Sequence, residues 1–281
     1  MFARQGVEME PELARAFIFE FQKYYKKLKH NKVLYSNHNY IPENIISMYM
    51  YYIHHLNYQA MIEDYKQKFI WNEAIVEPGV TKEEKRGLGL IYDYISAYDF
   101  EKKGYPDMFI EALKLHSLLY SQCPYPEFGG RLRVKDVYLK DTPYDVPSAD
   151  VARTIFNTYI GKKVQLKEDG DIFIYIDECV RANIDLIKLQ PFADGNKRTL
   201  RSLLNLQLAC IGIPPVYIKK SEREIYRQKL RDAILTGNYS NITRFYYYKI
   251  CDAIVEMDLN NIKTEEKGKS FIIEPKKKTT H

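Results

Sequence analysis

The stretch from Gln190 to Arg201 constrains this chain more than any other, because it sets charged and polar side chains against the start of a helix. The apolar residues that follow have the spacing of one buried helix face: Leu200, Leu203, Leu204, Leu208 and Ile211. Gly212 would end that helix. Free backbone N–H groups and the helix dipole favour anions at a helix start. The stretch is therefore predicted to be a loop that binds phosphate groups.

Individual side chains of this loop suit a nucleotide that carries magnesium. Gly195 allows the backbone to approach a ligand closely, and Asn196 can donate further hydrogen bonds. Arg198 and Arg201 can each fork onto phosphate oxygens. Proteins usually hold Mg²⁺ through one or two carboxylates and through substrate phosphates, so Asp194 is the expected metal ligand. The implied ligand is a magnesium-bound nucleotide.

The loop resembles the signature of the Fic family, His-x-Phe-x-(Asp/Glu)-Gly-Asn-(Gly/Lys)-Arg-x-x-Arg. Here it reads Gln-Pro-Phe-Ala-Asp-Gly-Asn-Lys-Arg-Thr-Leu-Arg, so every position but the first fits. The resemblance covers about residues 72–250. It implies a mainly α-helical bundle with a short β-hairpin, the flap, over the active loop. It also implies that AMP passes from ATP, with Mg²⁺ as cofactor, to a Ser, Thr or Tyr hydroxyl of a target protein.

Two positions of the motif leave the activity open. The family's first residue is a histidine that acts as general base, whereas the amide of Gln190 does not titrate. Losing a general base typically lowers the rate by about 10² to 10⁴. Lys197, expected among the phosphate-binding residues, replaces the usual glycine and matches the Doc branch, whose members resemble kinases in transferring the terminal phosphate. Three interpretations remain: a weakened or rescued AMP-transferring enzyme, a non-catalytic nucleotide-binding or interaction protein, and a Doc-like phosphoryl transferase.

The segment Trp71–Thr81 resembles a regulatory segment found before many Fic cores, Ser/Thr-x-x-x-Glu-Gly/Asn, whose glutamate pairs with the final arginine of the motif. Glu77 would be that inhibitory glutamate, and it would occupy Arg201, the cation expected to hold the terminal phosphate. The match is partial, because Glu73 stands at the Ser/Thr position and Pro78 at the Gly/Asn position. The alternative is a solvated Glu77 that ends a helix.

Residues 129–141 change from a helical to an alternating pattern, with glycines before them and prolines after them. This pattern predicts a short hairpin, which the resemblance identifies as the flap that binds the target protein by strand addition. The side chains expected to select the target are Leu132, Val134 and Val137. The alternative is a surface hairpin without a partner.

The chain is predicted to form an N-terminal helical layer at 1–70, a candidate inhibitory segment with a helix at 71–100, a Fic core at 101–255 and a lysine-rich tail at 256–281. The tail is expected to be largely disordered. His116 lies among apolar residues and is predicted to pack within the core.

Composition narrows the classes of protein to consider. The 281 residues are 46% hydrophobic, enough for a substantial core. No run of about 18 apolar residues occurs, and the chain does not begin with a basic flank and an apolar core, so we expect no membrane span, no signal peptide and a cytoplasmic location. The four cysteines lack paired ligand spacing, which predicts free thiols. The net charge of +5 is diffuse, so nucleic acid is not an expected partner.

Overall fold

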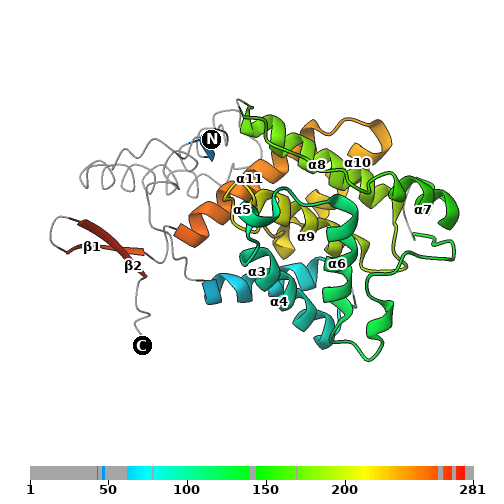
Figure 1. Ribbon diagram of the computed structural model, residues 1–281, viewed down its shortest axis with the longest axis horizontal. Coiled ribbons are helices and arrows are strands. Elements are labelled where there is room, and N and C mark those ends of the chain that lie inside the picture. The colour runs from blue at the N-terminus through cyan, green and yellow to red at the C-terminus, as the bar shows by residue number, and fades with distance from the viewer. Residues whose placement is uncertain are drawn as a thin grey trace. The chain divides into compact units, whose positions relative to one another are not determined.

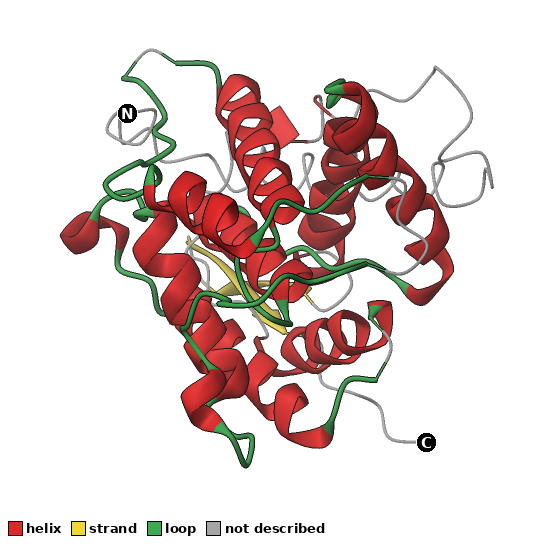
Figure 2. Cartoon of the chain, turned by 90° about the vertical axis from the view of Figure 1, so that its right-hand side faces the viewer, coloured by secondary structure: helices red, strands yellow, loops and turns green. Residues whose placement is uncertain are grey.

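The computed structural model describes residues 62–77, 79–139, 144–168, 170–258, 262–267 and 270–275, together with residues 43, 46 and 47. The chain divides into two compact units, Lys66–Lys249 and a second unit that combines Met1–Tyr65 with Ile250–His281. The described part of Lys66–Lys249 consists of helices and loops (Figures 1 and 2). It confirms the prediction of a mainly α fold, while most of the predicted layer at 1–70 lies outside the described residues.

The helices follow one another along the chain, and α3 and α11 each cross a boundary between the two units. They are α3 (Ile62–Val76), α4 (Lys82–Ser96), α5 (Phe100–Lys103), α6 (Met108–Tyr120), α7 (Ala149–Asn157), α8 (Ile172–Leu189), α9 (Asn196–Ala209), α10 (Arg223–Thr236) and α11 (Ser240–Asp258). Short 3₁₀ helices cover Pro126–Phe128 (η1) and Lys220–Glu222 (η2).

Helix α9 is central to the Lys66–Lys249 unit, and α4, α6 and α8 pack against it (Figure 1). The apolar pattern predicted one buried face, but every residue from Arg198 to Leu208 is buried. Asn205 and Gln207, two of the polar residues among them, bond to internal partners. Asn205 exchanges hydrogen bonds of 2.8 and 2.9 Å with the backbone of Val216, and Gln207 accepts one of 2.6 Å from Asn183. A helix enclosed in this way holds its neighbours in fixed positions around its N-terminus.

Helix α4 lies close to α6 because Gly87 has no side chain at their contact. A Cβ atom at Gly87 would lie 2.1 Å from the carbonyl oxygen of Leu119. A capping box starts α4, since the Thr81 hydroxyl accepts from the N–H of Glu84 at 3.1 Å and the Glu84 carboxylate accepts from the N–H of Thr81 at 2.7 Å. The packing brings the first turn of α4, including Glu84, to α9.

The predicted β-hairpin flap is not seen in the structure. Residues 129–139 and 144–147 form no strand, and residues 140–143 are not described. Several of their polar groups bond to neighbouring segments. The N–H of Arg133 donates to the carbonyl of Pro191 at 2.9 Å, and the Asp136 carboxylate accepts from the N–H of Ala149 at 2.7 Å. The segment is therefore an extended loop that is bonded to Pro191, in the loop between α8 and α9 that we call the active loop, and to the start of α7.

The tail expected to be disordered contains paired strands. β1 (Ile262–Lys267) runs antiparallel to β2 (Ser270–Pro275), with Ile262 opposite Pro275. The sequence Phe-Ile-Ile at 271–273 favours a strand, and the prediction gave more weight to the lysines that follow it. Within the part of the chain that the structure describes, no helix is long and apolar enough to cross a membrane.

Candidate functional site

The predicted phosphate loop joins α8 to α9, and two residues with positive φ mark its ends. Gln190 follows α8 with φ 47° and ψ 60°, and Gly195 precedes α9 with φ 71°. Between them, Phe192 is fully buried and stacks on His116, with ring centroids 3.9 Å apart and ring planes 8° from parallel. Phe192 thus anchors the loop in the core.

Asn196 closes the loop on itself. Its Oδ1 accepts from the N–H of Phe192 and its Nδ2 donates to the carbonyl of Phe192, each at 2.8 Å, and the side chain is buried. These bonds engage the amide that we expected to donate to a ligand. Asn196 therefore fixes the shape of the loop, and its side chain does not face outward.

His116 packs within the core, as the sequence predicted, and also supports the loop. Its Nδ1 accepts from the N–H of Gly130 at 2.8 Å, so in the neutral ring Nε2 donates to the carbonyl of Asp194 at 3.1 Å. Burial lowers the pKa of His116 to about 4. The neutral imidazole connects the turn before the predicted flap to the residue before Gly195.

We expect His116 to remain neutral from pH 5.5 to 8. Its pKa is lower in the folded than in the unfolded protein, so its contribution to stability is present above about pH 6.5 and is lost as the pH falls toward 4. An NMR titration, with the ring signals assigned by the His116→Gln variant, should show no midpoint in this range. The urea-unfolded chain should titrate near 6.5. A folded-state midpoint near 6.5 would contradict the hydrogen-bonded arrangement.

Asp194 faces outward at the start of α9, where a metal ligand is expected. Its side chain is 68% exposed, and its Oδ2 accepts from the hydroxyl of Tyr120 at 3.0 Å. Among the described residues, no group of three or more His, Cys, Asp or Glu side chains could hold a metal ion. A single carboxylate is nevertheless sufficient for Mg²⁺ when substrate phosphates supply the other oxygens. The donor set at Asp194 fits a magnesium nucleotide better than a metal bound by protein alone.

Gly195 leaves the start of α9 open to an anion. A Cβ atom there would lie 3.0 Å from both Leu119 Cδ2 and the hydroxyl oxygen of Tyr120, and the φ of 71° is a conformation that favours glycine. Gly195 makes no side-chain cap, so it does not itself engage the first-turn N–H groups of α9, and such groups favour anions. Binding of phosphate at Gly195 stays a prediction.

Arg198, predicted to bind phosphate, is paired within the protein. Its Nη1 lies 2.6 Å from Glu84 Oε1 in a buried ion pair, and its Nη2 lies 3.4 Å from Asp194 Oδ2. Sequence reasoning missed Glu84. The Thr-x-x-Glu pattern at 81–84 was a visible signal, but it predicts only a helix cap. Glu84 holds the guanidinium beside the exposed carboxylate of Asp194.

Arg201 is bound by two carboxylates from the end of α3 and the residues after it. Its Nε donates to Glu73 Oε2 at 2.8 Å and its Nη1 donates to Glu77 Oε1 at 3.2 Å. Lys197 Nζ lies 3.7 Å from the other oxygen of Glu77. Glu77 is thus within hydrogen-bond reach of Arg201, the distance that the inhibitory hypothesis requires. We refer to Glu73, Glu77, Lys197 and Arg201 as the arginine clamp.

Glu73 is the more deeply buried carboxylate of the arginine clamp. The side chains of Glu73 and Arg201 are 1% and 3% exposed, and Glu73 Oε1 has no hydrogen-bond partner. Burial raises the pKa of Glu73 above its ordinary value although Arg201 opposes the shift. Burial also acts to raise the pKa of Glu77, but Arg201 and Lys197 together hold it below its ordinary value. Sequence reasoning treated Glu73 only as a departure from the family pattern and missed its contact.

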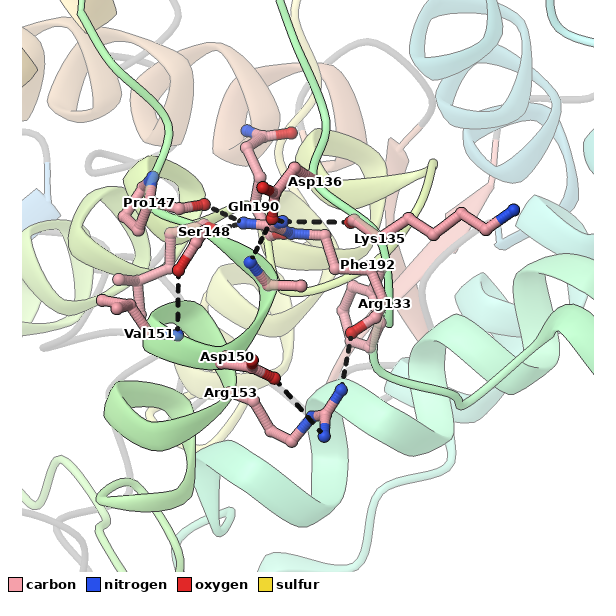
Figure 3. A network of polar contacts seen from close by, with 12 residues as sticks. Arg133, Lys135, Asp136, Pro147, Ser148, Asp150, Val151, Arg153, Gln190 and Phe192 are labelled. Carbon is pink, nitrogen blue, oxygen red and sulfur yellow. Dashed lines mark hydrogen bonds and ion pairs between the residues drawn. The ribbon is translucent and has the colours of Figure 1, made fainter.

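Gln190 does not present its amide outward. The side chain is buried, and its Nε2 donates to the backbone carbonyl of Ile187 at 2.7 Å. The backbone carbonyl of Gln190 accepts from Nε of Arg133 at 2.7 Å (Figure 3). The predicted target-selecting residues lie in the loop that contains Arg133. Val134 is 76% exposed, whereas Leu132 and Val137 are half-buried.

Curated proteins that carry one name are similar to this chain. No protein-family model matches the chain. "Protein adenylyltransferase Fic" of Nematostella vectensis is 26% identical over 203 residues, covering 69% of this chain and 45% of that protein. The protein of the same name from Aedes aegypti is 26% identical over 191 residues, covering 65% of this chain and 37% of that protein. The chain therefore spans less than half the length of these curated relatives.

Solved structures share the fold. Fic-1 (residues 134–508) from C. elegans has a TM-score of 0.55 and 18% identity, and the match covers 87% of this chain and 82% of that one. A Fic domain containing signaling protein from Bacteroides thetaiotaomicron has a TM-score of 0.54 and 12% identity, covering 85% of this chain and 94% of that one.

Proposed function

The chain belongs to the Fic family, and from this we propose that it binds ATP with Mg²⁺ and transfers AMP to a hydroxyl group of a target protein. The observation that carries the proposal is the start of α9, where the exposed carboxylate of Asp194 lies beside the uncapped first turn and beside Arg198. Relatives named as protein adenylyltransferases support this choice of reaction.

The first turn of α9, Asp194 and Gln190 each have a part in the proposed reaction. The first turn of α9 would bind the phosphates, Asp194 would hold Mg²⁺, and the ion would offset the negative charge of the phosphates. The hydroxyl oxygen of the target would form a bond to the α-phosphorus while the bond to pyrophosphate breaks. The hydroxyl proton then needs an acceptor. Because a glutamine amide is not a base, we expect slow transfer from this site.

A second function is favoured by the buried side chain of Gln190. Its amide donates to the carbonyl of Ile187 and so does not reach toward a target hydroxyl. A nucleotide-binding protein with little or no turnover would have such a site. Lys197 was the reason to consider Doc-like transfer of the terminal phosphate, and its described contact is with Glu77 of the arginine clamp. That contact does not favour phosphoryl transfer over AMP transfer.

The arginine clamp is proposed to restrain the site. An exposed ion pair contributes only about 0–1 kcal/mol, which is too little to exclude a nucleotide. The pair between Glu73 and Arg201 is almost fully buried, and breaking a buried pair typically costs about 3–5 kcal/mol. Arg201 would have to leave both carboxylates before it could hold a terminal phosphate. We therefore propose that Glu77 inhibits together with Glu73.

The loop at 131–139 is the proposed binding site for the target protein. Val134 is exposed there, and the loop is attached to the active loop through the bond from the N–H of Arg133 to the carbonyl of Pro191. A target held at this loop would lie next to residue 190.

Calorimetry with ATP and Mg²⁺ tests the proposed function. The Glu73→Ser, Glu77→Gly variant should bind ATP about 10- to 100-fold more tightly than the wild type, because hydrogen bonds to charged groups contribute about 1.5–3 kcal/mol once Arg201 is released. Adding Arg198→Ala should weaken that binding.

Glu83→Gln is a matched control for the binding experiment. Glu83 lies on α4 and pairs with Arg86, whose side chain is exposed, at 3.6 Å, so removing its charge should leave the affinity for ATP unchanged. If neither the wild type nor the double variant binds ATP or ADP, the proposed function is wrong.

A further inference from the structure

We propose that Arg133 is a positioning residue that joins the target-binding loop to residue 190 and fixes the two relative to each other. The inference rests on the proposed function for its catalytic consequence. It concerns a residue outside the motif and outside the arginine clamp.

The guanidinium of Arg133 bonds to backbone carbonyls from three segments (Figure 3). Its Nε donates to Gln190 at 2.7 Å, its Nη1 to Lys135 at 3.2 Å, and its Nη2 to Leu189 at 3.4 Å and to Pro147. Its own N–H donates to the carbonyl of Pro191. One residue therefore contacts the end of α8, the active loop and the residues before α7.

These contacts need the shape of a guanidinium as well as its charge. The side chain of Arg133 is 1% exposed, and the carboxylate of Asp136, itself half-exposed, lies 3.8 Å away. The guanidinium donates to backbone carbonyls and not to that carboxylate. Some of these carbonyls lie at the end of α8, where the negative end of the helix dipole favours a cation. A planar fork with five donors can bond to several carbonyls at once, whereas a lysine ammonium cannot adopt that arrangement.

The position of Arg133 has a consequence for residue 190. Gln190 has φ 47°, a left-handed conformation that residues other than glycine adopt only when their surroundings hold them there. Arg133 bonds to the carbonyl of Gln190 through its side chain and to the next carbonyl, at Pro191, through its backbone. It thereby sets the direction of the side chain at the position where the family places its base.

The same residue also fixes the loop that presents Val134. The carbonyl of Arg133 accepts from Nη2 of Arg153 on α7 at 3.3 Å, and its guanidinium bonds to Lys135 and Pro147 on either side of the undescribed residues 140–143. A change at Arg133 therefore moves the site of the base and the site of the target together. The phosphate-binding turn of α9 lies outside these contacts.

The catalytic test uses Arg133→Lys in a parent protein that carries Glu73→Ser, Glu77→Gly and Gln190→His. A displacement of about 1 Å at a reacting group can lower a rate about 100-fold, so kcat should fall about 10- to 100-fold and KM for the target protein should rise. The affinity for ATP should change less than about twofold, because α9 is not touched. Arg86→Lys, a change at an exposed arginine on α4 that lies 3.6 Å from Glu83, should leave kcat within about twofold of the parent. Unchanged kcat and KM, or a parallel loss of ATP affinity, would overturn the inference.

Hydrogen exchange tests the same inference without any transferase activity. In the protein with Gln190, Arg133→Lys should increase exchange in peptides spanning residues 130–139 and 188–194 together, while the α4 peptide at 82–96 stays protected. Increased exchange in only one of the two segments would overturn the inference. If the parent protein lacks activity, the proposed function fails, and the exchange of the two segments still decides whether Arg133 couples them.

Discussion

Replacing Gln190 with histidine in the Glu73→Ser, Glu77→Gly variant should raise the rate of AMP transfer to protein by about 10²- to 10⁴-fold. The imidazole can accept the hydroxyl proton at neutral pH, whereas the amide cannot. The variant background matters because Arg201 is bound by two carboxylates in the wild type. The rate is measured with ATP labelled at the α-phosphate, and mass spectrometry of the modified hydroxyl separates added AMP from added phosphate.

A second substitution at the same position is the matched control. Gln190→Asn changes the size of the amide without adding a base, so it should not raise the rate. The rate of the histidine variant should fall as the pH drops below the pKa of the introduced imidazole, and the rate of the asparagine variant should not. Equal inactivity of both variants on every target tested would contradict the prediction and favour the nucleotide-binding protein.

Replacing Arg201 with methionine should lower the free energy of unfolding by about 3–5 kcal/mol. The substitution leaves the buried carboxylate of Glu73 without a counterion, and its Oε1 already lacks a hydrogen-bond partner. Urea unfolding measures the loss. The control is Arg227→Met, which removes a more exposed arginine 3.4 Å from Glu224 and should change stability by only about 0–1 kcal/mol.

The loss caused by Arg201→Met should shrink as the pH falls. The pKa of Glu73 is raised in the folded protein, and it rises further without the guanidinium, so ionisation of Glu73 destabilises the variant most at neutral pH. In the wild type, the pKa of Glu77 is lowered, so the ionised carboxylate stabilises the folded protein at neutral pH, and this stability is lost in acid. Both effects make the difference in the free energy of unfolding between the wild type and Arg201→Met larger at pH 7.5 than at pH 5.

The double variant Glu73→Met, Arg201→Met should recover most of the lost stability, since two apolar side chains can replace a buried ion pair. A loss that does not depend on pH, or a double variant no more stable than the single one, would show that Glu73 is not the group left uncompensated. The same comparison therefore measures how strongly Glu73 and Arg201 are coupled.

The sequence predicted the loop between α8 and α9 well, because a long motif and the apolar spacing that follows it are local signals. It predicted less about what the loop contacts. Periodicity reports which face of a helix is buried, but Arg201 bonds to Glu73 across 128 positions of sequence, and no local pattern encodes that pairing. Comparison with the family pattern treated Glu73 only as a departure from that pattern. Its role is to pair with Arg201, because a buried cation needs a carboxylate close to it.

The flap shows a different limit of sequence reasoning. Alternation around Val134 predicted a hairpin, but alternation specifies only which side chains face solvent, and the described residues bond to the active loop and to α7 instead of to a second strand. Arg133 was part of that alternating pattern and was not singled out. Its role became visible only when the carbonyls around its guanidinium were known.

The most direct test of the account is a crystal structure of the Glu73→Ser, Glu77→Gly variant with Mg²⁺ and an ATP analogue that cannot be cleaved. We predict phosphate oxygens at the first-turn N–H groups of α9, the metal ion on the carboxylate of Asp194, and the guanidinium of Arg201 on the terminal phosphate. A nucleotide bound elsewhere, or phosphates that contact neither Asp194 nor Arg201, would contradict the claim that this loop is a nucleotide site restrained by the arginine clamp.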